Sequence, residues 1–449
     1  MVPDYQKALQ YLYSFVDYEK LPGAAPEART LDLIEGLLEA LDHPEQQWPS
    51  VHVTGTKGKG STAVMTAFMV QKSGYRVGLY TSPHLVTYRE RLVVNGQKIS
   101  KKDFCRLIDK ARPVLDGFLR DNETPPSFFD VWTALAFLYF AEQEVDLAVV
   151  EVGLGGRLDS TNVLMPEAAV ITPIGLDHTD RLGTTLSEIA GEKSGIIKRG
   201  VPTISGPQEP EALAVIQEAC AALESPLTQV GVDLHYTIRH TDRKRQVFDV
   251  ESQTDSYHDL NIPLMGAYQV TNATTAIAVV ETLKRGGLPI SSEAIAGGLK
   301  DALIPGRLQV IQEDPCIILD GAHNVLSAQT LVQTLQTLFS GRRIIVILSL
   351  HQDKDVAGIC GVLSSTGDAF IVTRRQVVRK RQAEPESVAA LLKVSGKPVT
   401  ITSTVREALD LAQAMSGPEG VVCVTGSFYL VGETIEVLHN LVPEEMMSR

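Results

Sequence analysis

Apolar residues recur along the chain in two spacings, which together predict helices that alternate with buried strands. Between residues 31 and 41, Leu and Ile recur three and four positions apart, which is the spacing of an amphipathic helix. Short, mainly apolar runs are instead typical of strands that are covered on both faces, as in a parallel sheet. In the first half of the chain such runs stand at 51–53, 77–80, 147–152 and 169–172.

A glycine-rich stretch follows the first of these strands. The strand at 51–53 runs into residues 55–61, a long apolar helix at 63–73 follows, and the next strand begins at residue 77. Strand, glycine loop, helix and strand is the order of a parallel βαβ unit. A helix at 131–142, placed directly ahead of another buried strand, repeats the alternation.

The pattern changes after residue 228 and again after residue 304. Residues 228–262 alternate apolar and polar side chains over short segments, which predicts a small antiparallel sheet. A helix at 272–285 then closes the first unit, and the Pro-Gly pair at 305 and 306 is typical of a hinge. We therefore expect an N-terminal domain over residues 1–304 and a C-terminal domain over residues 305–449.

The C-terminal part predicts a second α/β unit. Its expected elements are strands at 316–319, 344–348, 370–373 and 421–425 and helices at 327–339 and 355–363. Strands separated by helices are typical of a parallel sheet with helices on its faces. Both parts of the chain are therefore expected to be doubly wound α/β domains, with a cleft between them.

Composition and charge narrow the class of protein. Of the 449 residues 44% are apolar, and the net charge is −13, whereas nucleic-acid binders usually carry a basic surface. The five cysteines are scattered without a CxxC pair, which predicts neither a disulfide framework nor a cysteine metal site. The N-terminus has no signal-peptide core, and no apolar run is long enough to span a bilayer. We expect a cytoplasmic protein with no nucleic-acid and no membrane partner.

The strongest chemical signal is the loop Val53-Thr-Gly-Thr-Lys-Gly-Lys-Gly-Ser-Thr62. Glycines let backbone N–H groups approach phosphates, the following helix directs its positive end at them, and a lysine neutralises their charge. Gly60 separates Lys59 from Ser61, so the loop departs from the common GxxxxGK[ST] form. A glycine turn with a surface lysine is the structural alternative, but the position between a strand and a long helix favours a nucleotide site.

A carboxylate at the end of a buried strand is the second signal. Glu151 ends the apolar run at 147–152, where a charge without a partner would be costly. The carboxyl ends of parallel strands are also where open α/β sheets bind ligands. A magnesium ion held by Glu151, by a hydroxyl such as that of Ser82, and by phosphates and water would fit this position. An ion pair between Glu151 and Arg157 is the structural alternative.

Further motifs occur in a fixed order along the chain. They are Tyr80-Thr-Ser-Pro-His-Leu85, Arg89-Glu-Arg-Leu, Asn95-Gly96, Glu151-Val-Gly-Leu-Gly-Gly-Arg-Leu-Asp-Ser-Thr-Asn162, Leu176-Asp-His178, Glu192-Lys-Ser-Gly195, Pro305-Gly-Arg307, Asp320-Gly-Ala-His-Asn324 and Gly426-Ser-Phe-Tyr-Leu-Val-Gly432. With the loop spacing, they closely resemble the folylpolyglutamate synthase and dihydrofolate synthase family of the Mur ligase superfamily. The resemblance implies a Mur-ligase-like fold: a P-loop-type parallel-sheet ATPase domain followed by a smaller Rossmann-like α/β domain.

The resemblance also implies ligands for the first domain. ATP would contact Gly55, Thr56, Lys57, Gly58, Lys59, Gly60, Ser61 and Asn272. Magnesium would be held by Ser82, Glu151 and His178, and a second magnesium by Lys193 after carbamylation with CO₂. The structural alternatives are a surface role for His178 and an ion pair of Lys193 with Glu192 or Asp177.

In the second domain, Arg307 and Asp320 match positions that contact ATP, and His323 and Ser427 match positions associated with the incoming glutamate. Arg307 lies at the predicted hinge, from which a guanidinium could reach phosphates once the domains close. A capped helix start would also explain the segment at 320–324, and capping and binding can coexist. The catalytic residues expected from the resemblance are Lys59, His178, Lys193, Arg307 and His323.

Two segments match positions that contact the pterin. They are Phe128, Phe129 and Asp130, and Leu158, Asp159 and Ser160. Aromatic rings could stack on a flat pterin, but core packing would explain them equally well, and Asp130 replaces the glutamate usual in the family. The basic cluster, made of Arg374, Arg375, Arg379, Lys380 and Arg381, is either a solvated loop or a binding surface for a polyglutamate tail.

These expectations combine into one reaction. An ATP-dependent amide ligase would add L-glutamate to folates, and also to dihydropteroate, through an acyl phosphate, and we expect it to act as a monomer. A Mur-type ligase that acts on another carboxylate, such as a cell-wall precursor, is the alternative enzyme. A nucleotide-gated switch is the alternative of another class, and it would turn over ATP without needing glutamate.

Overall fold

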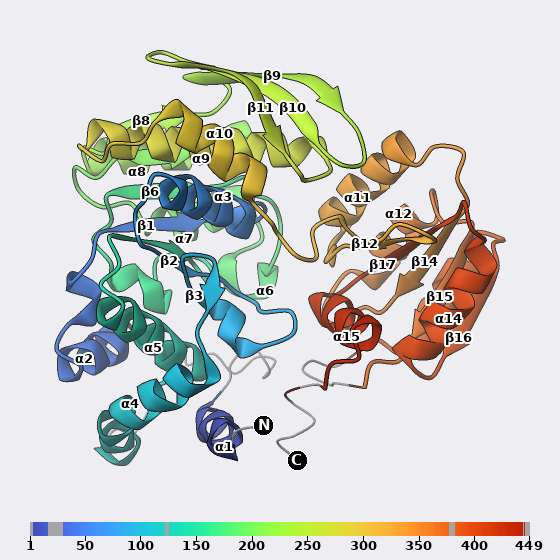
Figure 1. The fold of residues 1–449 in the computed structure, drawn as a ribbon, viewed down its shortest axis with the longest axis horizontal. Helices are drawn as coiled ribbons and strands as arrows, with labels where there is room; N and C mark the ends of the chain where they lie inside the picture. The colour runs from blue at the N-terminus through green and yellow to red at the C-terminus, as the bar shows by residue number, and fades with distance from the viewer. Residues whose placement is uncertain (1–2, 17–29, 122–124, 377–381, 443, 445–449) are drawn as a thin grey trace.

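Two α/β bodies stand side by side in the computed structural model, each built on its own sheet (Figure 1). The structure describes residues 3–16, 30–121, 125–376, 382–442 and 444. The loop predicted around residues 21–26 lies outside the described residues, as do Arg379, Lys380 and Arg381 of the basic cluster.

The first sheet has eight strands, six of them parallel. Their order is β4 (Gln97–Lys98), β3 (Leu92–Val94), β2 (Val77–Tyr80), β5 (Leu147–Glu151), β1 (Ser50–Thr54), β6 (Ala168–Ile171), β7 (Thr203–Ser205) and β8 (Leu227–Gln229). The parallel strands are β2, β5, β1, β6, β7 and β8, and β3 and β4 are antiparallel additions at one edge. The central strands β1, β5 and β6 are buried throughout, which explains why their sequences are apolar runs without alternation.

Helices cover both faces of this sheet and form two separate cores. One face carries α3 (Lys59–Lys72), α9 (Ala267–Arg285) and α10 (Ser292–Asp301). The other carries α1 (Pro3–Leu12), α2 (Asp32–Ala40), α4 (Lys101–Asp121) and α5 (Phe128–Glu142). The remaining helices of the unit are α6 (Thr179–Leu182), α7 (Leu186–Ser194), α8 (Pro210–Ala222) and the 3₁₀ turns Pro44–Gln46, Tyr88–Arg91 and Ser160–Val163.

Three predicted helices begin three or more residues earlier than expected. Helix α3 starts at Lys59 rather than at residue 63, because Gly58 adopts φ +90° and so ends the loop there. Helix α5 starts at Phe128 rather than at 131, because Ser127 and Asp130 form a capping box. Helix α9 starts at Ala267 rather than at 272. The polar first turn of α3 hides its start from an apolar periodicity, whereas α5 begins with Phe128 and Phe129, which the prediction left outside the helix.

The predicted antiparallel excursion is confirmed. Strands β9 (Leu234–Thr241), β10 (Gln246–Ser252) and β11 (Ser256–Ile262) form a three-stranded sheet in the order β11-β10-β9. Phe248 and Tyr257 anchor this sheet in the core that α3 and α9 share. The turn after β9 reaches the second body, where the Arg243 guanidinium lies 5.9 Å from the centre of the Phe339 ring.

The second sheet has six strands in the order β12 (Gln309–Gln312), β13 (Cys316–Leu319), β17 (Val421–Thr425), β14 (Ile344–Leu348), β15 (Ala369–Thr373) and β16 (Val399–Thr402). All neighbours are parallel except the edge pair of β12 and β13. Its helices are α11 (Val325–Leu338), α12 (Val356–Leu363), α13 (Pro385–Lys393), α14 (Val405–Ser416) and α15 (Phe428–Leu438). The strands predicted at 316–319, 344–348 and 421–425 have these bounds in the structure.

The two bodies meet where the chain passes between them. Helix α10 is the last element on the first sheet and β12 is the first strand of the second, so the predicted boundary at 304 and 305 falls in the connection. Met265 and Tyr268 pack against the second core. Near the C-terminus, Glu444 returns to the first body and accepts hydrogen bonds from Tyr5 at 3.1 Å and from Thr87 at 2.9 Å.

None of the helices in the described residues has both the length and the apolar character needed to cross a membrane. All five cysteines lie in described parts of the chain, and each is a free thiol.

Candidate active site

The glycine loop lies between strand β6 and helix α9, and two of its glycines are required by close approach. A Cβ on Gly55 would lie 1.9 Å from the Thr172 hydroxyl, and one on Gly58 would lie 2.3 Å from the Asn272 carboxamide oxygen. Both glycines also have positive φ, at +143° and +90°. The loop is therefore held in one shape by backbone packing, and Asn272, predicted to contact ATP, is part of its wall.

Helix α3 points its amino end out of this loop. Gly58 is its N-cap and provides no side-chain cap, so the first-turn N–H groups lack the partner that a Ser or Asp would supply. Lys59 curls over the loop, where its Nζ donates to the Gly55 carbonyl at 3.2 Å. Together with the loop glycines, this arrangement suits a phosphate chain. Residues 56–60 are partly exposed and Ser61 is buried beneath them.

Glu151 faces the same loop from the end of β5. It is 4% exposed, and its Oε2 accepts a hydrogen bond from the Ser82 N–H at 3.1 Å. Burial raises the pKa of this carboxyl, and the charge of Lys59 opposes the rise. Gly60 lies beside it, since a Cβ there would be 3.5 Å from Oε2. Arg157, the alternative partner, is instead 3.3 Å from Glu192.

The residues beside the phosphate loop fit a magnesium ion that is held by few protein groups. Glu151 supplies one buried carboxylate and Ser82 one hydroxyl next to the phosphate loop, which suits Mg²⁺ completed by phosphates and water. In the described parts of the chain, no three His, Cys, Asp or Glu side chains converge on one metal position. The structure thus brings Ser82 and Glu151 together, and it places His178 Nε2 4.0 Å from the Asp177 carboxylate.

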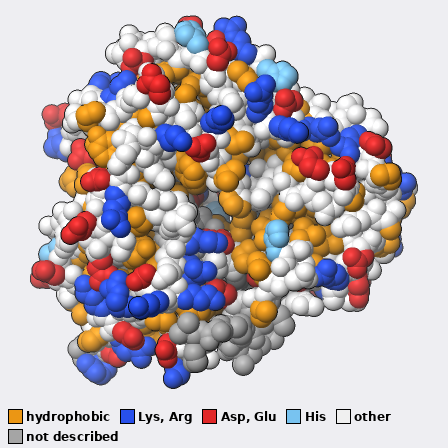
Figure 2. Space-filling model, in the orientation of Figure 1, with side chains coloured by type: hydrophobic (Ala, Val, Ile, Leu, Met, Phe, Trp, Pro, Cys, Tyr) orange, Lys and Arg blue, Asp and Glu red, His pale blue; other side chains and the backbone are white. Residues whose placement is uncertain are grey.

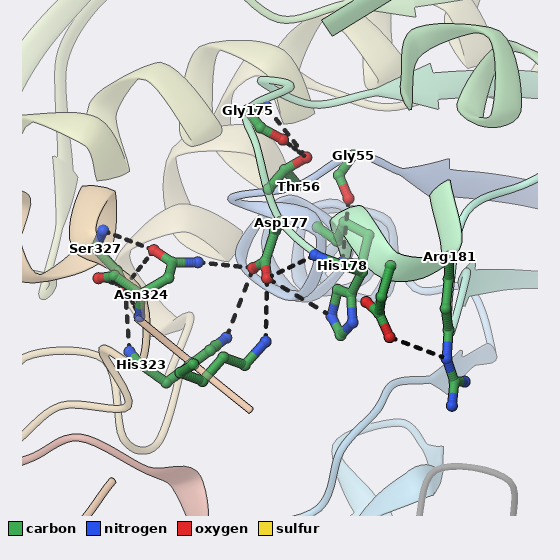
Figure 3. Close-up of polar contacts among 12 residues, drawn as sticks. Gly55, Thr56, Gly175, Asp177, His178, Arg181, His323, Asn324 and Ser327 are labelled. Atoms are coloured by element: carbon green, nitrogen blue, oxygen red, sulfur yellow. Dashed lines mark hydrogen bonds and ion pairs between the residues drawn. The ribbon is translucent and has the colours of Figure 1, made fainter. Parts of the chain in front are cut away.

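His178 belongs to a cluster around Asp177 that joins the two bodies (Figure 3). The Asp177 carboxylate accepts from the Asn324 amide at 2.7 Å and from Lys354 Nζ at 3.1 Å. His323 Nε2 lies 3.9 Å and His178 Nε2 4.0 Å from it. Burial acts to raise the pKa of Asp177, but the positive groups around it outweigh burial and hold the pKa below its usual range.

Asp177 and Lys354 are functional candidates that the sequence prediction missed. Asp177 stands inside the motif Leu176-Asp-His178, but only the histidine was assigned a role. Asn324, also unassigned, caps helix α11 and bonds Asp177 with its amide. Lys354 carries no sequence signal, because it lies in a loop without a motif, 177 positions from its partner.

Lys193 lies under the glycine loop. It is 4% exposed, and its Nζ donates to the Gly55 carbonyl at 3.0 Å. Burial, helped by the nearby charge of Lys59, lowers the pKa of Lys193 to about 7. Glu192, one alternative partner of Lys193, is paired with Arg157.

The predicted residues of the second domain gather at the carboxyl ends of its strands. Buried Asp320 accepts from the Leu308 and Ala322 N–H groups, each at 2.9 Å, and burial raises the pKa of its carboxyl. The Arg307 guanidinium lies 4.5 Å from the centre of the Phe428 ring. The charge of Arg307 opposes the pKa rise of Asp320.

His323 and Ser427 are held by neighbours in the second domain. Nδ1 of His323 lies 2.8 Å from the Gly321 carbonyl, and burial lowers the pKa of this imidazole well below its usual value. The Ser427 hydroxyl lies 3.0 Å from His351 Nε2 and accepts from the Tyr429 N–H, so it caps α15. Capping and the predicted binding role thus fall on the same hydroxyl.

The two predicted pterin segments contact each other. Asp130 accepts from the Ser127 N–H at 2.8 Å and from the Ser160 hydroxyl. Phe129 packs on Gly153, where a Cβ would lie 2.4 Å from its ring. Phe128 instead belongs to an aromatic core, 5.8 Å from the Tyr88 ring.

In the second predicted pterin segment, one of the two remaining residues is buried and the other is exposed. Asp159 is buried and accepts from the Leu154 N–H at 2.9 Å, whereas Leu158 is 41% exposed. In the basic cluster, Arg374 pairs with Glu386 at 2.7 Å, and buried Arg375 lies over the Tyr429 ring. These two arginines therefore have different surroundings rather than forming one patch.

A surface hollow separates the two bodies, and Lys and Arg side chains line part of its wall (Figure 2). The Asp177 cluster shows that residues from both sheets meet between the bodies. A phosphate loop from one sheet and polar strand ends from the other thus face a shared site, which suits a reaction that joins a nucleotide-activated group to a second substrate.

Comparison with known proteins identifies the family. Residues 53–280 match the model of the Mur ligase middle domain, and residues 306–428 match that of the Mur ligase glutamate ligase domain. The dihydrofolate synthase/folylpolyglutamate synthase of Bacillus subtilis is 34% identical over 435 residues, covering 96% of this chain and 99% of that protein. The chain belongs to the folylpolyglutamate synthase/dihydrofolate synthase family. The resemblance predicted from the motifs is confirmed.

Solved structures of the family confirm the predicted fold class. The folylpolyglutamate synthase of Thermotoga maritima aligns with a TM-score of 0.86 at 35% identity over 99% of both chains. That of Mycobacterium tuberculosis, complexed with ADP and AMPPCP, gives 0.88 at 30% identity over 98% of this chain and 99% of its own. This family member is an ATP-dependent ligase of the type that adds glutamate to folates.

Proposed function

We propose that the chain adds L-glutamate both to reduced folates and to dihydropteroate, with ATP as the source of activation. The observation that carries the proposal is a chain of contacts between the domains. Thr56 of the phosphate loop bonds Gly175, and Asp177, two residues later, bonds Asn324 and Lys354 of the second domain. The relative in Bacillus subtilis carries both activities in its name, and E. coli FolC has been solved in complex with DHPP and ADP, with a TM-score of 0.82.

In the proposed reaction, an oxygen of the acceptor carboxylate attacks the γ-phosphorus of ATP, giving an acyl phosphate and ADP. The amine of glutamate then attacks the acyl carbon, the bond to the phosphate oxygen breaks, and the amine loses a proton. Catalysis of such steps depends on positioning and on neutralising charge. Residues 1–304 would bind ATP and acceptor, and residues 305–449 would bind glutamate.

The roles of the first-domain residues follow from their positions. The loop at 55–61, with Lys59 over it, would hold the phosphates, and Asn272 would support the loop. Ser82 and Glu151 would hold magnesium, which when bound neutralises phosphate charge. Phe129, Asp130, Asp159 and Ser160 would shape the acceptor site with exposed Leu158, and Phe128 would support them from the core.

The roles of the second-domain residues rest on charge and burial. Arg307 and Asp320 would contact ATP once the domains close on it, and His323 and Ser427 would position glutamate. His178 would act beside Asp177, at the border between the domains. Closure would exclude water, which would otherwise hydrolyse the acyl phosphate.

Carbamylation of Lys193 is a further part of the proposal. The reaction with CO₂ requires a neutral amine, and burial lowers the pKa of Lys193 to about 7, so that form is populated near neutrality. The carbamate would carry negative charge and oxygen donors toward a second magnesium. Replacing Lys193 with Ala should remove most activity, and added short carboxylic acids should restore part of it. Wild-type turnover in Lys193→Ala would contradict the carbamate.

The assay that tests the function compares acceptors. Phosphate release should require glutamate together with either dihydropteroate or tetrahydrofolate. Activity on a muramyl precursor and on neither pterin would favour the alternative Mur-type ligase. ATP turnover without glutamate would instead indicate a nucleotide switch. We also propose that the chain works as a monomer in the cytoplasm. The five free thiols support a reducing compartment.

A further inference from the structure

The loop after strand β2 contacts both domains. It starts at Ser82, whose N–H donates to Glu151 at 3.1 Å beside the phosphate loop. Three residues later, the side chain of Leu85 packs against the core of the second domain, together with Leu430 and Val431 of α15. A residue proposed to hold magnesium and a residue seated in the other domain thus belong to one short segment.

Two glycines of the connection and the second domain make room for Leu85. A Cβ on Gly432, inside helix α15, would lie 2.2 Å from the Leu85 carbonyl oxygen. A Cβ on Gly306 would lie 3.2 Å from Leu85 Cδ1. Glycine in a helix interior is about 1 kcal/mol less favourable than alanine, so Gly432 needs a packing reason. The approach of the Leu85 backbone supplies that reason.

The loop is also braced internally, so it responds as a unit. The Glu90 carboxylate accepts from the N–H groups of Leu85 at 2.8 Å and of Thr87 at 3.2 Å. The Thr87 hydroxyl donates to Glu444 at 2.9 Å, which is a second contact with the C-terminal part of the chain. A shift at Leu85 therefore cannot be absorbed by loose residues on that side of the loop, and it passes toward Ser82.

We infer that Leu85 and Gly432 are positioning residues: their contact sets the place of Ser82 beside Glu151, so that docking of the glutamate domain organises the magnesium and phosphate site of the other domain. The inference rests on the proposed role of Ser82 and Glu151. Neither Leu85 nor Gly432 touches the phosphate loop or Glu151 among the contacts of the described residues.

Opposite perturbations of the contact test the inference. Gly432→Ala adds a methyl group that displaces the Leu85 carbonyl, and Leu85→Ala removes the wedge from its seat. Both should raise the magnesium concentration for half-maximal AMPPCP binding about ten-fold, because a displacement of about 1 Å at a distance can cost far more than that in a preorganised site. Calorimetric titration of the full chain measures this binding without a folate and without turnover.

Matched controls separate positioning from stability. Gly361→Ala changes a glycine in helix α12 of the same domain, where an added Cβ meets nothing within 4 Å. Leu85→Met keeps an apolar wedge of similar volume. Both controls should bind AMPPCP with the magnesium dependence of the wild type. Hydrogen exchange of the amides at 85–87, without ligands, should quicken in Leu85→Ala and Gly432→Ala but in neither control.

Three outcomes would overturn the inference. The first is an unchanged magnesium dependence in folded Gly432→Ala, and the second is an equal change in Gly361→Ala. The third is wild-type AMPPCP binding that does not depend on magnesium. Each is distinct from a failure of the proposed function, which would appear as absent glutamate-dependent phosphate release in the wild type.

Discussion

The two parallel sheets both place polar side chains at the carboxyl ends of their strands, but they do so at different structural cost. In the first domain, Glu151 at the end of β5 and Lys193 in helix α7 are buried, and burial is the largest cause that shifts the pKa of each toward its neutral form. In the second sheet, Asn324 and Ser427 each cap a helix and so contribute to folding as well. Buried charged groups such as Glu151 and Lys193 lower the free energy of unfolding unless a bound ligand compensates their charge.

This difference has a consequence for substitutions. Removing a charge from the first site should lower activity and leave stability equal or higher. Removing a cap from the second site should lower both, because the same side chain satisfies the helix and contacts the site. Asp320 is intermediate, since burial raises the pKa of its carboxyl although two backbone N–H groups already bond it.

The largest effect is expected at Lys59. Replacing Lys59 with Ala removes a charge that lies over the glycine loop, and loss of one preorganised electrostatic group costs about 10²-fold or more in kcat. The melting temperature should not fall, because Lys59 contributes charge rather than core. The control is Lys72→Ala at the other end of α3, where the lysine pairs with Asp301 on the surface. Near-normal turnover by folded Lys59→Ala would contradict a role of this lysine in activity.

Asp177→Asn should have the next largest effect. Asp177 bonds Lys354 and Asn324 across the two bodies, and truncating one partner of a largely buried charge pair costs about 2 kcal/mol or more. That corresponds to about 30-fold in kcat/KM for glutamate. Nucleotide binding to the first domain should change little. Asp180→Asn, an exposed neighbour that pairs with Arg181, is the control, and equal kinetics in both variants would contradict a role in joining the domains.

Acid should lower the free energy of unfolding through His52. This histidine is fully buried in β1 and lies within hydrogen-bonding distance of Thr161. Burial lowers the pKa of His52 to about 3, against 6.5 in the unfolded chain. Between these values the unfolded state binds a proton that the folded state does not, so stability falls as pH drops below 6.5. From pH 7.5 to 5.0 the contribution is about 2 kcal/mol.

The measurement is the melting temperature at the two pH values. A neutral His52→Gln variant should lose less on acidification than the wild type, whatever its stability at pH 7.5. The exposed His258→Gln variant should behave as the wild type. Parallel losses in all three proteins would show that His52 is not the acid-sensitive group.

The smallest effect is expected at Asn324, a helix cap of the second domain. Asn324→Ala removes the cap of α11 and should cost about 1 kcal/mol of stability. Asn324→Ser keeps a good cap but loses the amide that reaches Asp177. The serine variant should therefore retain the wild-type melting temperature and share the kinetic loss of the alanine variant. If serine restored both properties, capping alone would explain Asn324.

The sequence predicts most of the strands because their burial on both faces leaves an unmistakable apolar run, as in β13, β14 and β17. The glycine loop is equally readable, since its glycines are demanded by local packing on Thr172 and Asn272. Two helix starts are predicted too late for different reasons. Helix α3 begins with polar residues that carry no apolar period, whereas the start of α5 is set by the capping box of Ser127 and Asp130.

What the sequence does not predict depends on pairs far apart in the chain. Lys354 meets Asp177 across 177 positions, and no local pattern marks the lysine. Phe128 and Phe129 are adjacent and chemically identical, yet one lies in an aromatic core while the other packs on Gly153. A one-residue rotation about a helix decides their roles, and only the assembled fold determines that rotation.

The hydrogen bonds of Tyr5 to Glu444 have a topological consequence. They connect residues 439 positions apart, one in the first helix and one beyond the last, so the polypeptide is almost a closed ring. The ring passes through both domains, and its closing contact joins α1 to a residue beyond α15, the last helix of the second domain. Figure 1 shows α1 close to the C-terminal end of the chain. Any opening of the domains must therefore break this contact or carry Glu444 along. A pair of fluorophores near the two chain ends would consequently report domain opening without touching the site.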